Sequence, residues 1–175
     1  MHWIAEGERI ALRAMILDDA PRLAEYRNDA QVARYQSWSH CTPDAARKLI
    51  AASGRPERDD PGRWRQIAIV LRHDRRLIGD CAVHTPTEEP GQAEIGFTLC
   101  REYWGRGLAS EAVSALVAWL FAERRKSRIF AVTDGRNLTA SRLLEGLSFT
   151  RDPRFDRIVW FKGEFGPESV WTRSR

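Results

Sequence analysis

Short apolar runs along the first half of the chain predict strands separated by helices. Four runs have the alternation or composition of strands, over residues 9–15, 64–71, 76–84 and 92–99. A helix is predicted over residues 18–28, with Asp18 or Asp19 as its N-cap. A second is predicted over 42–53, where a threonine N-cap precedes a proline at the first helical position. We expect residues 34–40 to be irregular.

A long apolar stripe with helical spacing dominates the second half of the chain. It extends from about Gly105 to Glu123 and is broad enough to lie against a sheet. A strand over residues 128–133, a helix over 138–147 and two antiparallel strands within 149–171 follow. The succession of strand, helix and strand requires one parallel pair joined by a right-handed crossover. We therefore predict an α+β fold, a mostly antiparallel mixed sheet with one parallel junction, in a single domain over residues 1–175.

Composition and charge narrow the class of protein without deciding it. Hydrophobic residues make up 43% of the chain and charged residues 30%, as in ordinary soluble domains. Because no apolar run approaches a membrane span and the start of the chain has no signal-peptide pattern, we expect a cytoplasmic protein with no membrane partner. The net charge of +4 fits nucleic acid or a small anionic ligand. The basic residues are spread along the chain, which disfavours nucleic acid.

The three cysteines are scattered along the chain. Cys41, Cys81 and Cys100 lack the paired spacing of a metal site, so no metal is predicted. We expect a reducing compartment in which the thiols pack as small apolar groups.

The stretch with the clearest chemical meaning runs from Tyr103 to Ser110, where Gly105 and Gly107 precede the long helix. The first backbone N–H groups of a helix have no partner within the helix and attract anions. Glycine leaves them accessible to a pyrophosphate because it has no Cβ and tolerates unusual φ values. We interpret the stretch as an anion-binding loop. From the two glycines alone, a helix start without a ligand is equally compatible.

The order of elements around this loop resembles the GNAT superfamily of acetyl-CoA-dependent N-acetyltransferases, in particular its ribosomal-protein alanine acetyltransferase (RimJ/RimL-like) branch. The resemblance runs from the first strand to about residue 163, and four stretches carry it: Leu77–Gly79, Ala93–Phe97, Tyr103–Ala112, and Asn137 through Arg142–Glu145 to Phe149. It implies a GNAT-like fold in which the parallel junction splays apart. Two positions depart from the family pattern. Ser148 replaces a usual glycine, and Ala140 replaces a frequent serine, which stands one residue later as Ser141.

The resemblance implies that acetyl-CoA is the cofactor and acyl donor. Strand backbone groups at the splay would bind its pantetheine arm and face the thioester carbonyl, while the glycine loop would bind its pyrophosphate. The residues implied in cofactor binding are Phe97, Thr98, Leu99, Trp104, Gly105, Arg106, Gly107, Leu108, Ala109, Ser110 and Asn137. Core packing of Trp104, a surface position for Arg106 and an N-cap role for Asn137 are the alternatives.

Acetyl transfer to an amine also needs a base, because an alkylammonium with a pKa near 10 has no free lone pair. Glu94, on the strand before the splay, is the first candidate, and half-burial there would move its pKa towards neutral. The alternative is that Glu94 points to solvent, since its strand neighbours share an apolar face. His84 is the second candidate base. Ser141 is a candidate acid for the leaving thiolate.

The acceptor is not identified by the sequence. We expect its pocket to include Tyr35 and Trp38, the loop after Thr85 and the last hairpin. None of the cysteines lies where a covalent acetyl carrier is expected, which favours direct transfer to a primary amine of a peptide or small molecule. A catalytically weak acyl-CoA-binding sensor is the alternative, motivated by Ala140 and by the absence of tyrosine from residues 137–149. A homodimer is compatible with either hypothesis.

Overall fold

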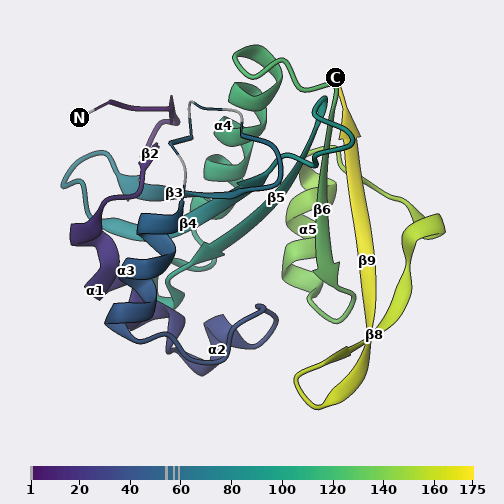
Figure 1. Ribbon diagram of the computed structural model, residues 1–175, viewed down its shortest axis with the longest axis horizontal. Helices are drawn as coiled ribbons and strands as arrows, with labels where there is room; N and C mark the ends of the chain where they lie inside the picture. The colour runs from purple at the N-terminus through teal and green to yellow at the C-terminus, as the bar shows by residue number, and fades with distance from the viewer. Residues whose placement is uncertain (1, 54, 57, 59) are drawn as a thin grey trace.

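The computed structural model describes residues 2–53, 55, 56, 58 and 60–175, so part of the loop predicted between the second helix and the second strand lies outside the described residues. In the described part, the helices pack around one sheet (Figure 1). The strands are β1 (Ala5–Glu6), β2 (Ile10–Ala14), β3 (Trp64–Leu71), β4 (Leu77–His84), β5 (Gln92–Leu99), β6 (Arg128–Asp134), β7 (Thr150–Arg151), β8 (Arg157–Phe161) and β9 (Glu164–Ser174). The helices are α1 (Ala20–Arg27), α2 (Ala30–Ala33), α3 (Pro43–Ala52), α4 (Leu108–Ala122) and α5 (Leu138–Gly146).

The sheet is antiparallel except at one junction. Its strand order is β1-β2-β3-β4-β5-β6-β9-β7, and β8 pairs with β9. Among the described residues, β5 and β6 form the one parallel pair, with Gln92, Ala93 and Glu94 opposite residues 128–130. Beyond Glu94, β5 continues to Leu99 without pairing to β6, so the sheet opens there into a splay. The predicted α+β fold with a splayed parallel junction is confirmed.

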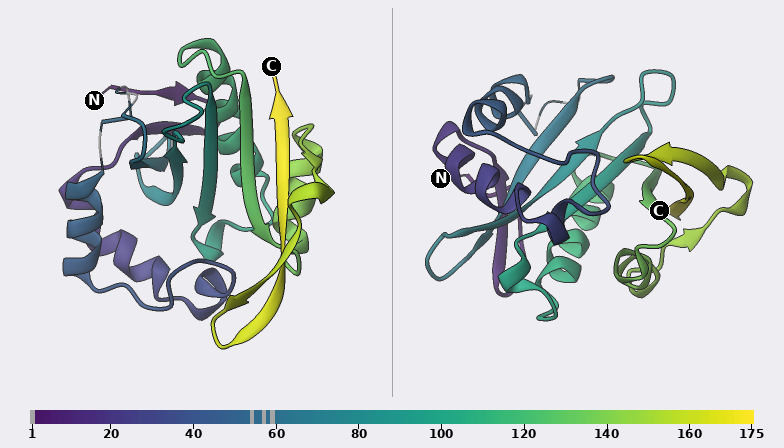
Figure 2. Two further views of the ribbon diagram at one scale, coloured as in Figure 1. Left: turned by 45° about the vertical axis from the view of Figure 1, so that its right-hand side comes forward. Right: turned by 90° about the horizontal axis from the view of Figure 1, so that it is seen from below.

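Helices cover both faces of the sheet. Figure 2 shows α1 and α3 on one side and α4 and α5 on the other. Alternation along β5 sends Ala93, Ile95 and Leu99 to the α4 side, where they are buried. It sends Glu94 and Thr98 to the α1 side. The splay is therefore accessible to ligands from two different faces of the sheet.

Most predicted elements are confirmed to within a few residues, and residues 34–40 are irregular as expected. The long helix begins at Leu108 instead of Gly105, because both loop glycines adopt left-handed backbone conformations that end the preceding turn. Asp19 precedes α1, but its carboxylate accepts hydrogen bonds from the Arg13 guanidinium at 2.6 and 2.7 Å and does not cap α1. The two-residue strand β7 is too short to produce a sequence pattern.

Ser148 occupies a backbone conformation that favours glycine. Its φ is 62°, directly after the turn that ends α5. A left-handed conformation costs about 1–2 kcal/mol in a residue with a side chain. The usual glycine of the resembled family therefore has a local backbone reason, and the serine at this position retains the same conformation.

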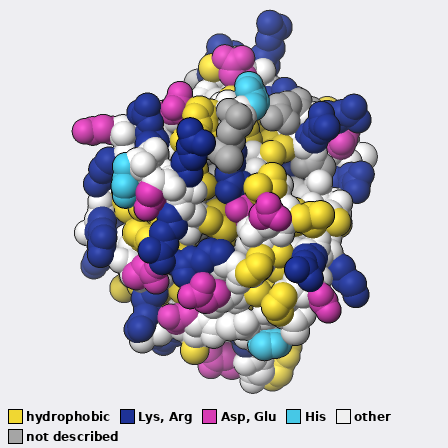
Figure 3. All heavy atoms as spheres, turned by 90° about the vertical axis from the view of Figure 1, so that its left-hand side faces the viewer, with side chains coloured by type: hydrophobic (Ala, Val, Ile, Leu, Met, Phe, Trp, Pro, Cys, Tyr) yellow, Lys and Arg dark blue, Asp and Glu magenta, His cyan; other side chains and the backbone are white. Residues whose placement is uncertain are grey.

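Two surface properties bear on partners. Among the described residues, no helix is long and apolar enough to cross a membrane. On the face shown in Figure 3, lysine and arginine side chains are interspersed with aspartate and glutamate and do not gather in one patch.

The three cysteines are buried and unpaired.

Candidate functional site

A cavity of about 640 Å³ lies at the splay, between the end of β5 and the first turns of α4 and α5. We call it the donor cavity. The expected cofactor residues that line it are Phe97, Thr98, Leu99, Trp104, Gly105, Gly107, Leu108, Ala109, Ser110 and Asn137. Arg106 is absent from its described lining. The structure therefore brings ten of the eleven expected cofactor residues to one cavity.

The glycine loop fits a pyrophosphate. Gly105 and Gly107 have φ values of 72° and 74°, which residues with side chains rarely adopt. A Cβ placed on Gly105 would meet no atom within 4 Å, so it would project into open space beside the loop. Gly107 is the N-cap of α4 and has no side chain to cover the N–H groups of the first helical turn. These N–H groups, with the Ser110 hydroxyl, would hold the pyrophosphate.

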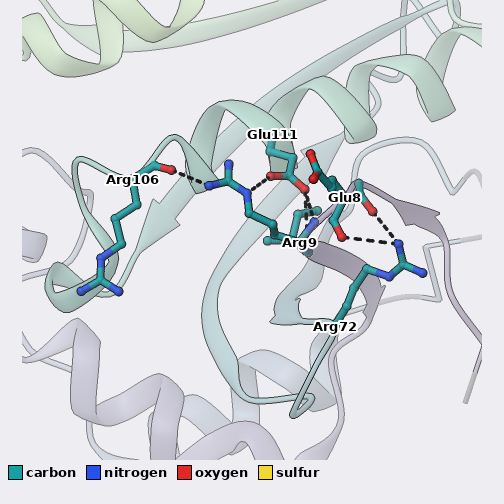
Figure 4. A network of polar contacts seen from close by, with 7 residues as sticks. Glu8, Arg9, Arg72, Arg106 and Glu111 are labelled. Atoms are coloured by element: carbon teal, nitrogen blue, oxygen red, sulfur yellow. Dashed lines mark hydrogen bonds and ion pairs between the residues drawn. The ribbon is translucent and has the colours of Figure 1, made fainter.

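A polar network around Arg9 fixes the direction of this loop (Figure 4). Arg9 Nη1 donates to the Arg106 carbonyl at 2.9 Å, and Arg9 Nε donates to Glu111 Oε2 at 2.8 Å. Figure 4 shows the Arg106 carbonyl turned towards Arg9 and the Arg106 guanidinium pointing away from it. Since C=O and N–H point in opposite directions across a trans peptide, this contact directs the Gly107 N–H away from Arg9. Arg106 therefore acts on the loop through its backbone carbonyl, and its guanidinium is absent from the described lining of the donor cavity.

Glu111 holds the other end of the network. Its Oε1 accepts hydrogen bonds from the backbone N–H groups of Arg9 at 2.6 Å and Ile10 at 3.3 Å. Burial alone would raise the pKa of Glu111, but the hydrogen bonds from Arg9 and Ile10 outweigh it and lower the pKa. Glu111 is thus ionised at neutral pH. Sequence reasoning missed both Arg9 and Glu111, because the two residues are 102 positions apart.

We expect Glu111→Gln to weaken CoA binding about tenfold, because a hydrogen bond to a charged group contributes about 1.5–3 kcal/mol. Calorimetric titration with CoA and with pantetheine, which lacks the pyrophosphate, measures this. Pantetheine affinity is expected to stay constant, since the network positions only the pyrophosphate loop. Glu123→Gln, an exposed position just after the same helix, is the control. An equal loss for both ligands would show that Glu111 stabilises the whole fold and not this loop.

Along β5, the backbone N–H and C=O groups of successive residues point alternately towards β4 and towards the splay. Cys100 N–H donates to the Ile78 carbonyl at 2.8 Å, so by alternation the backbone groups of Thr98 also pair with β4. Those of Phe97 and Leu99 point into the splay. The Leu99 carbonyl accepts from Trp104 Nε1 at 2.8 Å. The expectation that all three residues offer free backbone groups is therefore wrong for Thr98 and for the Leu99 carbonyl. The Phe97 carbonyl also has a donor, Gln36 Nε2 at 3.5 Å.

A second cavity of about 450 Å³ lies on the α1 side of the splay, and we call it the acceptor cavity. Tyr35, Trp38 and Glu94 line it, as do residues of the β8–β9 hairpin. The described residues that line both cavities are Tyr35, Gln36, Phe97 and Thr98, so the cavities meet at the splay. The expectation for the loop after Thr85 is not met, since none of its described residues lines this cavity. Thr85 is itself buried and accepts a hydrogen bond from Arg65.

Glu94 and His84 lie side by side, with Glu94 facing the acceptor cavity. The Glu94 side chain is 25% exposed, so the alternative that it points freely into solvent does not hold. Burial, and then the nearby Glu168 carboxylate, raise the pKa of Glu94. His84 Nδ1 lies 3.8 Å from Glu94 Oε2, and the His84 ring stacks on Trp64. Burial, and then the Arg65 guanidinium, lower the pKa of His84, so His84 is neutral at neutral pH. His84 is absent from the described lining of the acceptor cavity.

Ser141 is not brought to either cavity. Its hydroxyl donates to the Asn137 carbonyl at 3.3 Å, and its side chain lines a separate groove on the outer side of α5. Ala140, one residue earlier, lines the donor cavity. The expectation that Ser141 protonates the leaving thiolate is therefore not supported by its position. Asn137 caps α5, accepting from the Ala140 N–H at 3.2 Å, and also lines the donor cavity.

Comparison with known proteins identifies the family. The family described as an acetyltransferase (GNAT) domain matches residues 9–150. An uncharacterised N-acetyltransferase, p20 of Bacillus licheniformis, is 34% identical over 146 residues, which cover 83% of this chain and 81% of p20. YoaA of Bacillus subtilis, another uncharacterised N-acetyltransferase, is 29% identical over 162 residues, covering 91% and 90%. The chain belongs to the GNAT acetyltransferases.

Solved structures agree on the fold. A GNAT acetyltransferase from Bacillus anthracis superposes with a TM-score of 0.82 at 22% identity, covering 97% of both chains. RimL, a ribosomal L7/L12 alpha-N-protein acetyltransferase solved in complex with coenzyme A, superposes with a TM-score of 0.83 at 16% identity, covering 99% of this chain and 98% of RimL. At these identities the likeness shows the fold alone. The family match and the related sequences show that the protein is an acetyltransferase that uses acetyl-CoA.

Proposed function

We propose that this acetyltransferase moves the acetyl group directly to a primary amine held in the acceptor cavity, with Glu94 as the general base. The observation that carries the proposal is the pair of cavities that meet at Phe97 and Thr98. One contains the glycine loop, and the other contains a partly buried carboxylate with a raised pKa. A primary amine of a peptide or of a small molecule fits this arrangement.

Glu94 makes the amine nucleophilic. A carboxylate with a raised pKa is a stronger base than an ordinary one, and burial and then Glu168 raise the pKa of Glu94. Glu94 accepts the ammonium proton, directly or through one water. His84 is neutral and beside Glu94, so it shields that carboxylate from solvent on one side without competing for the proton.

The donor cavity places the acyl group. When bound, acetyl-CoA would supply an acetyl thioester: the amine nitrogen bonds to the acetyl carbon, the C–S bond breaks and CoA leaves as a thiolate. The proton that the nitrogen loses on forming the amide passes to that thiolate or to water. The N–H groups of Phe97 and Leu99 point into the splay and are the donors available to the thioester oxygen. Preorganised donors of this kind contribute on the order of 3 kcal/mol.

Direct transfer is supported by the state of the cysteines. Neither cavity has a cysteine among the described residues that line it. Burial raises the pKa of Cys100 to about 12, and burial also raises the pKa of Cys81. A thiol that is not ionised is a poor nucleophile. The acetyl group therefore passes to the acceptor without a cysteine carrier.

Incubation of the protein with acetyl-CoA and a panel of primary amines tests the proposal. We expect release of free CoA thiol, matched by acetylated amine in mass spectra. Acyl-CoA binding in calorimetry without thiol release from any amine or peptide would instead favour the sensor, an alternative consistent with the distance of Ser141 from both cavities. A stable acetylated cysteine on the protein would contradict direct transfer.

A further inference from the structure

The acceptor cavity carries more negative than positive charge. Glu94, Asp134 and Glu168 line it, and Asp134 and Glu168 are opposite each other in the pairing of β6 with β9. Arg27 is the one basic residue among the described residues of its lining. Its guanidinium is already engaged, with Nη2 3.0 Å from Asp80 Oδ2. The three facing carboxylates are therefore not balanced within the cavity.

The counter-charges of these carboxylates lie outside the cavity. Asp134 pairs with Arg136 at 2.6 Å and Glu168 pairs with Arg157 at 2.5 Å. The Arg157 side chain is 67% exposed while Glu168 is 20% exposed, so solvent screens the cation more than the carboxylate. Among the described residues, the ion-pair neighbour of Glu94 is His84, which is neutral, and the other nearby charge is the Glu168 carboxylate. A ligand in the cavity thus experiences a negative potential.

Gln66 gives an independent indication of what the cavity binds. Gln66 lies on β3, is 7% exposed and lines the acceptor cavity. Its Oε1 is buried and has no hydrogen-bond partner among the described residues. Because buried carbonyl oxygens are nearly always paired, this atom is available to accept from a water or from an N–H group of a bound ligand. Trp38 Nε1, in the same lining, is also unpaired among the described residues and offers a donor.

We propose that the acceptor is a small primary amine that carries a second cationic group, held by Glu168 while the reacting amine lies at Glu94. Asp134 adds negative charge nearby, but both of its oxygens are already held by Arg136. This inference rests on the proposed function and names its substrate class. Trp38 and Phe161 line the same cavity and provide apolar surface for the carbon chain between the two nitrogens. The cavity volume falls in the range of small-molecule sites, about 300–1,000 Å³.

A cross-link between the walls restricts the shape of the occupant. Lys162, in the turn between β8 and β9, donates to the carbonyls of Ala33 at 2.6 Å and Trp38 at 2.5 Å. Figures 1 and 2 show this turn beside the segment after α2. The hairpin and the Trp38 segment, which form two walls of the acceptor cavity, are therefore tied together. A slender, flexible diamine fits between tied walls better than a folded protein surface does.

The test compares 1,5-diaminopentane with pentylamine, which differ only in the second amine. After division by two for its equivalent amines, kcat/KM for the diamine is expected to exceed that for pentylamine by about tenfold or more, because a charge-assisted contact is lost in pentylamine. Glu168→Gln is expected to reduce this ratio by about fivefold or more. Glu25→Gln removes the same charge from an exposed position on α1 outside the cavity lining, and the ratio is expected to stay at the wild-type value.

Two results would overturn the inference. Equal kcat/KM values for the two amines, or a higher value for a neutral peptide with a free N-terminus, would reject a dicationic acceptor while leaving acetyl transfer to an amine in place. A wild-type ratio in Glu168→Gln would reject the assignment of the second group to Glu168. If acetyl-CoA binds but no amine or peptide is acetylated, the proposed function fails together with this inference.

Discussion

Glu94→Gln is expected to lower kcat by about 10²–10³-fold, because a positioned general base contributes about 10²–10⁴-fold. Glutamine has the same shape but cannot accept the amine proton at this position. The KM for acetyl-CoA is expected to stay near the wild-type value, since Glu94 lines the acceptor cavity and not the donor cavity. Initial rates of thiol release at saturating concentrations of both substrates measure the effect. A variant with the wild-type kcat would exclude Glu94 as the base.

The pH profile of kcat distinguishes a base from a binding residue. Burial and then Glu168 raise the pKa of Glu94 above the ordinary value of 4.5. Below that raised pKa Glu94 is protonated and inactive, so kcat rises as the pH increases through it. In Glu168→Gln the like charge is removed, and the rise is expected to move to lower pH. An unchanged position would assign the titration to another group.

Gly107→Glu is expected to weaken CoA binding by about 100-fold or more, and Gly107→Gln by about tenfold. Both side chains must adopt a φ of 74°, which costs about 1–2 kcal/mol. Only the glutamate adds a negative charge at the helix N-terminus where the pyrophosphate is expected. The difference between the two variants therefore measures the charge, and calorimetric titration with CoA determines both affinities.

A matched control for the backbone strain is Gly163→Glu. Gly163 has a φ of 89° in the β8–β9 turn and lies outside the described lining of the donor cavity. This variant places the same charge on the same type of backbone, and CoA affinity is expected to stay at the wild-type value. Thermal unfolding confirms that each variant is folded. Equal weakening by Gly107→Glu and Gly107→Gln would show that no anion approaches this loop.

The parts of the site that could be predicted are those formed by neighbouring residues. The loop from Tyr103 to Ser110 binds through the backbone of one short segment, so its residue types are enough to indicate its role. The strands and long helices follow from periods of 2 and 3.6 residues. Glu94 could be proposed because the strand that carries it leads into the splay.

The rest depends on contacts between distant segments. Arg9 meets Glu111 because β2 packs against α4, and Glu168 meets Asp134 because β9 pairs with β6. Such neighbours have no local signal in a single sequence. Errors about which face of a helix or strand a side chain occupies have a similar origin. A period gives the spacing of residues but not the direction in which each one points. Ser141 was misplaced for this reason, because one residue on a helix turns the side chain by about 100°.

The arrangement of the two cavities has a consequence for the kinetics of turnover. They approach the sheet from opposite faces and share Tyr35, Gln36, Phe97 and Thr98 among the described lining residues. With acetyl-CoA in the donor cavity and the amine in the acceptor cavity, as proposed, neither substrate would need to cross the space that the other occupies. We therefore expect no fixed order of substrate addition, and free CoA and the acetylated product would depart in either sequence.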